Sequence, residues 1–137
     1  MWFTPLLQGA AAGVIISRPN SDVTVTGWTS SDAQPLYSDI DEVTANDVDY
    51  IYSPTLSGSL TSAVFGLSLS IPSGTHSIRI RAQRTAATGD VRVLLLDSSG
   101  TTVGTSSWQT LTAAFANYTL SVTTTGTAAR ISIEVRP

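Results

Sequence analysis

Apolar and polar residues alternate with a period of two through much of the second half of the chain. Three segments alternate in this way and a fourth is an apolar run of strand length: residues 76–83, 117–123 and 129–135, and residues 90–97. Successive side chains of a strand point to opposite faces of a sheet, so each segment is expected to bury one face. Several such strands in succession predict an all-β fold, an antiparallel β-sandwich of jelly-roll type.

Shorter strand signals extend the pattern through the rest of the chain. They are apolar or alternating runs that end near proline, glycine or polar residues: residues 14–17, 22–26, 49–53, 62–70 and 101–107. Residues 36–43 are the only segment with helical spacing, and they predict at most one helical turn. Together the segments predict about eight to nine strands. With no linker and no internal repeat, we expect a single β-sandwich domain over residues 14–137.

The first residues of the chain are apolar, and we treat residues 1–13 as an N-terminal arm or first edge segment. No lysine or arginine lies near Met1, and Pro5 and Gly9 break the apolar run, so neither a signal peptide nor a membrane-spanning helix is predicted. Two interpretations stay open: a first strand folded onto the chain's own core, or an arm that packs on a neighbouring subunit. In the second, the contacts are made by Trp2, Phe3, Leu6 and Leu7.

The composition excludes several classes of function. The net charge is −3, whereas a nucleic-acid-binding domain is expected to carry a basic surplus. Only 12% of the residues are charged while 42% are hydrophobic, which favours a packed fold whose polar faces are covered by hydroxyl groups. Cysteine is absent, so disulfides, zinc–thiolate sites and cysteine nucleophiles are excluded.

Catalytic chemistry has few candidate residues. His76 is the only histidine, and it is in phase with the apolar residues Ile78 and Ile80, a position typical of a partly buried or edge histidine. No Gly-x-Ser-x-Gly elbow accompanies it, so the sequence does not support a Ser-His-Asp site. We predict that the protein is not an enzyme.

Acidic residues gather in one short segment, which is the best candidate for a metal site. Its members are Asp39, Asp41, Glu42, Asp47 and Asp49. Carboxylate oxygens on loops suit Ca²⁺, a cation that takes oxygen ligands, but the glycine and the terminal glutamate of an EF-hand loop are missing. The alternative is a solvated acidic face with capping roles. We therefore predict no cofactor, with calcium at this cluster as the open exception.

Aromatic residues provide candidates for a sugar-stacking platform, although most aromatic side chains of a small sandwich belong to its core. We expect Trp28, Tyr50 and Tyr118 to be largely core. Trp108, in a predicted turn, and Tyr52 are the candidate glycan-binding residues.

Three arginines point away from the apolar faces of their predicted strands. Arg79 and Arg81 share one face of a strand, and Arg92 lies on the polar face of the next. If these strands are neighbours in one sheet, that sheet presents an arginine-bearing face that can bind carboxylates of a partner protein. The alternative is a set of cross-strand pairs with acidic residues, each of which contributes little stability.

Several short motifs resemble a block found in structural proteins of tailed bacteriophages and prophages. They are SRPNSD at residues 17–22, GWT at 27–29, LY at 36–37, IDE at 40–42 and DVDYI at 47–51. The Arg-x-Arg strand and the LLLDSSG run at 94–100 look like the same proteins, and the resemblance covers roughly residues 15–135. Such proteins are similar to carbohydrate-binding-module jelly rolls and serve on virions as head decoration (cement) proteins or as tail and fibre modules. The resemblance supplies no catalytic residues.

We therefore expect a structural protein of the virion, a capsid decoration protein that binds across neighbouring subunits of the major capsid protein and stabilises the head. Such a protein acts by adding buried area at the junctions between subunits. It is expected to be a homo-oligomer on the virion, with neither nucleic acid nor membrane as a partner. The alternative is a tail or fibre module that recognises glycans of the host surface.

Overall fold

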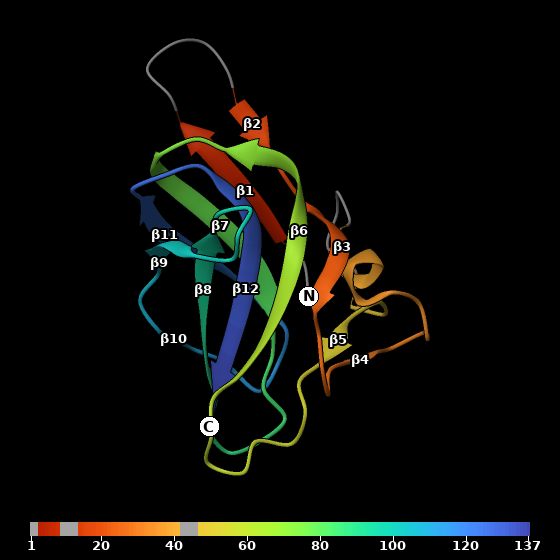
Figure 1. Cartoon of the computed structure of the whole chain (residues 1–137). Helices are drawn as coiled ribbons and strands as arrows, with labels where there is room; N and C mark the ends of the chain where they lie inside the picture. Colours follow the sequence, from red (N-terminus) through yellow and green to blue (C-terminus); the bar gives the residue numbers. More distant parts are fainter. Residues whose placement is uncertain (1–2, 9–13, 42–46) are drawn as a thin grey trace.

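The computed structural model describes residues 3–8, 14–41 and 47–137, and the side chains from residue 15 onward within these ranges. The described part of the chain contains twelve strands and one short 3₁₀ helix, η1 (Leu36–Asp39). Two antiparallel sheets lie face to face with the core between them (Figure 1). The prediction of an all-β sandwich is therefore confirmed.

The first sheet, which we call the β7 sheet, has the strand order β11-β7-β1-β2, with bounds Ala116–Thr124, Gly74–Ala82, Phe3–Gln8 and Val14–Ile16. The second, the β12 sheet, has the order β10-β8-β12-β6-β3, with bounds Gln109–Thr110, Asp90–Leu96, Ala128–Arg136, Thr61–Ile71 and Pro19–Thr24. A sixth strand, β9 (Thr102–Thr105), also pairs with β8.

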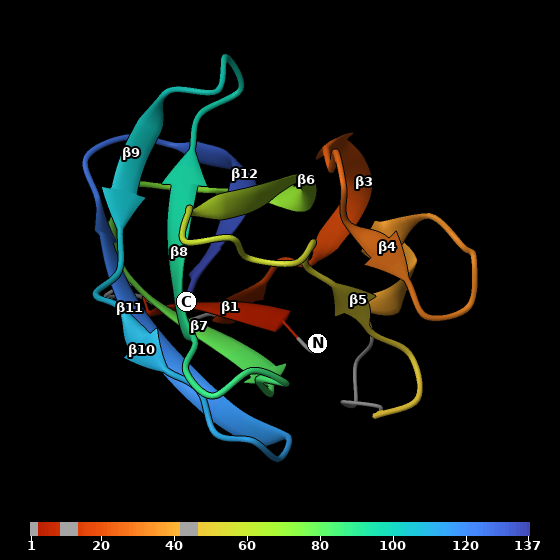
Figure 2. The ribbon, with the colours of Figure 1, turned by 90° about the horizontal axis from the view of Figure 1, so that it is seen from below.

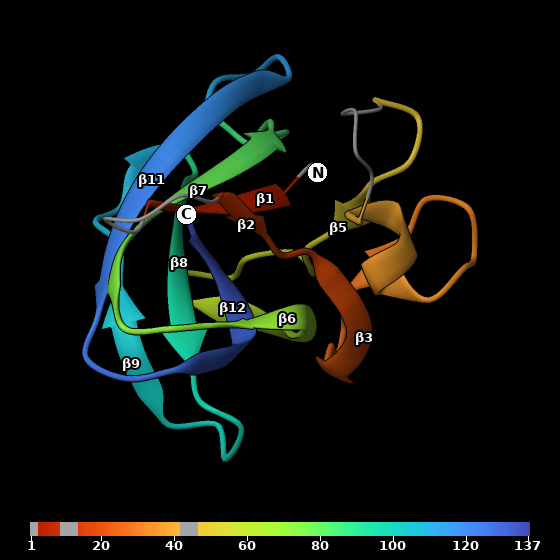
Figure 3. The same ribbon diagram turned by 90° about the horizontal axis from the view of Figure 1, so that it is seen from above.

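A small two-stranded unit lies beside the sandwich. It pairs β4 (Thr29–Ser30) with β5 (Ile51–Tyr52), and it sits with η1 next to the β3 edge (Figure 2 and Figure 3). The Asp22 carboxylate of β3 ties η1 to the sandwich, because it accepts hydrogen bonds from the Leu36 and Tyr37 amides at 3.0 and 2.8 Å. This unit supplies one side of the pocket described below.

The strand count exceeds the expected eight to nine because β1 forms in the segment treated as an arm or first edge segment, and because two strands that were not predicted, β4 and β10, are only two residues long. Strands that short carry no readable alternation. β3 begins at Pro19, earlier than the strand predicted from residue 22, whereas η1 occupies the predicted single turn. The jelly-roll connection of the strands stays a prediction.

The N-terminal segment takes part in the β7 sheet through its backbone. β1 pairs with β7 on one side and with β2 on the other, so it is an interior strand and β2 is the edge. This arrangement corresponds to a first strand folded onto the chain's own sheet. Trp2 lies outside the described residues, and so do the side chains of Phe3, Leu6 and Leu7; their proposed partner contacts stay predictions.

The core is built from the inward faces of both sheets. Phe65 of β6, Ile78 and Ile80 of β7, and Ile131 and Ile133 of β12 are all fully buried. Burial of side chains of this size contributes about 1.5–3 kcal/mol each before the entropy of ordering is subtracted. Trp28 belongs to this core, as predicted, and the half-buried Tyr118 packs against it.

Two short strands that follow one another in the chain, β9 and β10, cover the outer edge of β8. β9 pairs with the C-terminal half of β8 and β10 with its N-terminal half. Between them Ser106 continues the ladder: its amide donates to the Val93 carbonyl at 2.9 Å, and its Oγ accepts from the Val93 amide at 2.9 Å. β9 also reaches the other sheet, because the Thr125 amide donates to the Val103 carbonyl at 2.9 Å. This seam joins the two sheets along one side.

His76 is a buried histidine of the β7 sheet, and we expect it to make the free energy of unfolding depend on pH. Its Nε2 lies 2.9 Å from the Pro72 carbonyl, which can only accept, so the neutral ring donates from Nε2 and carries no proton on Nδ1. Nδ1 is buried without a hydrogen-bond partner in the described structure. Burial lowers the pKa of His76 below its ordinary 6.5, although the contact with Pro72 partly opposes the shift.

The unfolded chain binds this proton more readily than the folded chain. The contribution of the neutral His76 to the free energy of unfolding is therefore fully present above pH 6.5, and it is lost as the pH falls from 6.5 towards the lowered pKa of the folded state. Urea unfolding between pH 5 and 8 measures this dependence, and His76→Gln should flatten it within that window. An equal slope in the wild type and in His76→Gln would contradict the assignment.

Candidate functional site

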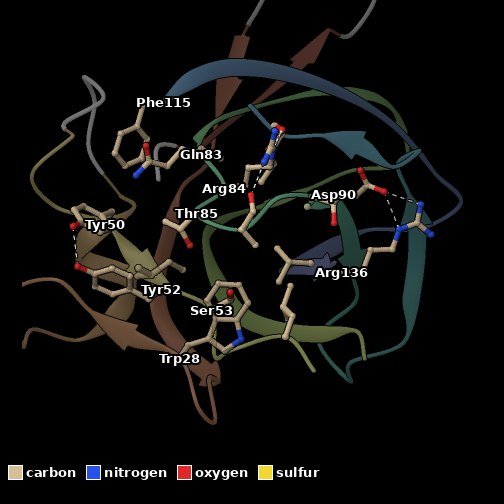
Figure 4. Close-up of a pocket in the computed structure, with 18 of the residues that line it drawn as sticks. Trp28, Tyr50, Tyr52, Ser53, Gln83, Arg84, Thr85, Asp90, Phe115 and Arg136 are labelled. Carbon is tan, nitrogen blue, oxygen red and sulfur yellow. Dashed lines mark hydrogen bonds and ion pairs between the residues drawn. The ribbon is translucent and has the colours of Figure 1, made fainter. Parts of the chain in front are cut away.

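A pocket of about 230 Å³ opens at the end of the sandwich that carries the C-terminus. Residues from five parts of the chain line it: Trp28 before β4, the stretch 50–56 that contains β5, the stretch 81–90 from the end of β7 to the start of β8, the segment 111–115 before β11, and the end of β12. Figure 4 shows these side chains around the cavity. Segments far apart in the sequence therefore meet in one concave site.

One wall of the pocket is aromatic. The Tyr50 ring stands edge-on to Tyr52 at a centroid distance of 4.8 Å and to Phe115 at 5.7 Å. The Tyr52 hydroxyl donates to the Tyr50 hydroxyl at 2.8 Å. The backbone of this wall is held by the residue that follows β4, because the Ser31 amide donates to the Tyr50 carbonyl at 2.9 Å. Tyr52 is 45% exposed, so the wall offers accessible aromatic surface.

The other side of the pocket is polar and is held in place by the backbone. Arg84 donates from Nε to the Leu111 carbonyl at 2.8 Å and from Nη1 to the Ala86 carbonyl at 2.5 Å. Its own amide donates to the Thr112 carbonyl at 2.9 Å. Gln83 and Thr85, its neighbours in the chain, also line the cavity and lie towards the aromatic wall (Figure 4). These bonds join the loop 83–89 to the segment before β11.

An ion pair closes the far side of the pocket. Asp90 accepts from Arg136 Nε at 3.0 Å and Nη2 at 2.9 Å, and from the Thr110 hydroxyl at 2.8 Å. The hydrogen bond from Thr110 and the pairing with Arg136 lower the pKa of Asp90, so the carboxylate is ionised at neutral pH.

A second ion pair flanks the aromatic wall. Arg81 donates to both carboxylate oxygens of Asp47, and its guanidinium lies 5.8 Å from the centre of the Phe115 ring. The hydrogen bonds from Arg81 lower the pKa of Asp47. Arg81 is thus occupied by a partner within the chain, and it orders the edge of the aromatic wall.

The structure separates the two predicted glycan-binding residues. Tyr52 lines the pocket, but Trp108 does not. The guanidinium groups of Arg92 and Arg136 lie over the Trp108 ring at 4.5 and 4.2 Å. Trp108 therefore has cations stacked on it, which restricts the ring surface left for a sugar.

Two aromatic residues of the pocket were missed by the sequence analysis. Tyr50, expected in the core, is half-buried and forms the centre of the aromatic wall. Its spacing of two from Tyr52 within a predicted strand was the available signal, because it places both rings on one side. Phe115 comes from a loop and carries no such signal.

The predicted arginine-bearing face does not form. Arg79 and Arg81 belong to β7 in the first sheet, whereas Arg92 belongs to β8 in the second. Arg92 instead pairs across strands with Glu134 at 2.6 Å, in register with it. This matches the alternative of cross-strand pairs, and such partly exposed pairs contribute little stability each. A docking role for these three arginines stays a prediction.

The acidic residues do not gather into a metal site within the described ranges. Asp47 is paired with Arg81, and Asp39 is 1% exposed with its Oδ2 unpartnered. Burial raises the pKa of Asp39, and the neighbouring Asp32 adds to this effect. Glu42 lies outside the described residues, and no group of three or more described His, Asp or Glu side chains is placed to hold a metal ion, Asp41 and Asp49 included.

Comparisons with protein-family models, with curated proteins and with solved structures found no match to this chain. Within the described residues, no helix has the length and apolar character needed to cross a membrane.

Proposed function

We propose that this chain is a non-catalytic carbohydrate-binding module of a bacteriophage virion, with the pocket at the end of the sandwich as its binding site. The observation that carries the proposal is the pairing of an exposed aromatic wall with a fixed polar wall in one cavity. The virion context rests on the resemblance of the sequence motifs to phage structural proteins.

The chemistry of a sugar ring matches these two walls. Each pyranose ring has an apolar face of C–H groups and an edge of hydroxyl groups. The apolar face packs on aromatic rings, here Tyr52 and its neighbour Tyr50. The hydroxyl groups form hydrogen bonds to polar side chains of the lining, here Gln83, Thr85 and the Asp90 carboxylate.

The size of the cavity also favours a small ligand. Pockets for drug-sized molecules span about 300–1,000 Å³, and this one has about 230 Å³. It therefore suits one or two sugar units at the end or along the length of a longer chain. Binding of that kind gains affinity from several copies on one particle.

The charged residues of the pocket favour binding over hydrolysis. Glycosidases use two carboxyl groups on either side of the scissile bond, whereas Asp90 is the one carboxylate among the described residues that line the cavity. His76 is buried in the β7 sheet and does not line the pocket. Recognition without cleavage is the simpler use of this site.

A second candidate is the capsid decoration protein expected from the sequence. It is favoured by exposed apolar side chains on β2, where Ile15 and Ile16 are 37% and 40% exposed, and on β6 of the other sheet, where Leu69 is 53% exposed. They lie close together, because the Ser17 Oγ donates to the Leu69 carbonyl at 2.7 Å. Exposed apolar groups next to an open strand edge are typical of surfaces that bind another protein.

One experiment with two arms tests these proposals. Wild-type protein is applied to an array of bacterial surface polysaccharides, and it is also sedimented with purified capsids of the phage. We expect saturable binding on the array. Binding to capsids together with a blank array would overturn the carbohydrate proposal and support decoration.

A further inference from the structure

The charged groups of the pocket indicate a chemical class for its ligand. Four charged side chains line the cavity: Arg81, Arg84, Asp90 and Arg136. Three of them are cationic, in a chain whose net charge is −3. The lining of the pocket therefore contains more cationic than anionic side chains, whereas the whole chain has a negative net charge.

Two of these three arginines are neutralised by an acidic partner. Arg81 is paired with Asp47, and Arg136 with Asp90. Arg84 differs from both, because its Nε and Nη1 donate to backbone carbonyls and no described carboxylate pairs with it. The carbonyls orient the guanidinium without cancelling its charge, and Nη2 is left without a partner in the described structure.

A half-buried guanidinium of this kind is a built anion site. Its orientation is fixed by the two carbonyls of Leu111 and Ala86, so little side-chain entropy is lost when a ligand binds. Guanidinium and carboxylate groups form short, charge-assisted hydrogen bonds. Figure 4 shows Arg84 between the tyrosine wall and the Asp90–Arg136 pair. A sugar ring stacked on Tyr52 can direct a substituent across the pocket towards it.

We propose that the pocket recognises an acidic saccharide, a polymer that contains hexuronic acid, and that Arg84 binds its carboxylate. This proposal rests on the proposed carbohydrate-binding function and names the ligand class of the same site. A uronic acid carries its carboxylate on the ring carbon that bears the hydroxymethyl group in a neutral hexose. The ring is then free to stack on the aromatic wall.

The test compares polysaccharides that differ only in this carboxylate. Polygalacturonate and a glucuronate-containing polysaccharide are arrayed with their carboxyl-reduced, neutral forms, next to the bacterial polysaccharides of the array described above. Wild-type protein should bind the acidic form at least about tenfold more tightly than its reduced form. The difference should shrink as salt is raised, because the contact is partly exposed.

Arg84→Gln should remove the preference, so that it binds the acidic and the neutral form with equal affinity, and Arg84→Lys should keep part of the preference. Arg130→Gln is the matched control, because Arg130 lies outside the pocket and should keep the full preference. Thermal unfolding of Arg84→Gln and Arg130→Gln, compared with the wild type, shows whether each variant is folded. If the variant fails to fold, the comparison of the two polysaccharide forms on the wild type decides the question.

Equal binding of acidic and reduced forms by the wild type would overturn the acidic-ligand proposal and leave the carbohydrate-binding function standing. Unchanged preference in a folded Arg84→Gln would overturn the role of Arg84. A blank result on every polysaccharide, acidic or neutral, would overturn the proposed function itself.

Discussion

Replacing Gly104 with alanine is expected to lower the free energy of unfolding by about 2–3 kcal/mol. Gly104 lies in β9, where that strand meets the other sheet. A Cβ at this position would lie 2.7 Å from the Thr123 carbonyl oxygen, 2.8 Å from Val122 Cγ1 and 2.9 Å from Thr124 Cγ2. All three neighbours belong to β11, a nine-residue strand paired along its whole length with β7.

The neighbours of Gly104 have little freedom to move. The nearest is a backbone oxygen, and Val122 and Thr124 are 1% and 4% exposed. Relief of the contact therefore requires β9 to move away from β11, which opens the seam between the two sheets. Segment 111–115, which lines the pocket, follows β9 and β10 in the chain. A shift of β9 should therefore displace this segment and weaken ligand binding as well as stability.

Urea unfolding followed by tryptophan fluorescence measures the effect. The free energy of unfolding should depend on urea concentration with the same slope in the variant and in the wild type, so that the two midpoints can be compared. Gly126→Ala is the matched control. A Cβ there meets only Val103 Cγ1, at an ordinary 3.5 Å, and we expect a change within about 0.5 kcal/mol. Equal stability of the two variants would show that β9 does not approach β11 this closely in solution.

Replacing Tyr52 with alanine is expected to weaken binding of the recognised polysaccharide by about thirtyfold or more. The loss corresponds to about 2 kcal/mol, the level at which an aromatic residue counts as an interaction hot spot. Tyr52 is exposed and packs on Tyr50 at the rim of the pocket. The fold should therefore survive the change, and the loss should appear in affinity with little change in the melting temperature.

Two control variants sharpen this measurement. Tyr52→Phe keeps the ring but removes the hydrogen bond to the Tyr50 hydroxyl, and its affinity should stay within a few-fold of the wild type. Trp108→Ala removes a ring that does not line the pocket but packs against Arg136, and its affinity should also stay within a few-fold of the wild type. The opposite pattern, in which Trp108→Ala abolishes binding and Tyr52→Ala does not, would move the sugar platform to Trp108.

Alternation along the sequence correctly predicted which side chains of the long strands face the core. In β7, Ile78 and Ile80 are fully buried and Arg79 is exposed, as a period of two requires. Ile131 and Ile133 of β12 are buried on the same principle. The prediction succeeds because the period is a local property of extended backbone.

The candidate site was only partly accessible to the same reasoning. Tyr52 was found, but Phe115, which contacts Tyr50 in the same wall, comes from a loop that follows β10 and has no pattern of its own. Arg81 was assigned to a docking face, whereas it pairs with Asp47 beside the small β4–β5 unit. Arg84 was not singled out at all, since its orientation depends on the Leu111 and Ala86 carbonyls.

The sequence by itself determined the all-β class, the buried and exposed faces of the long strands, and the absence of cysteine chemistry. Only the tertiary structure decided that β1 lies between β2 and β7, that the arginines are divided between two sheets, and that residues from five separate segments meet in one pocket. The first set depends on the geometry of neighbouring residues along the backbone. The second depends on closing long loops and on pairing strands that are remote in the chain, and a periodic pattern carries no information about those partners.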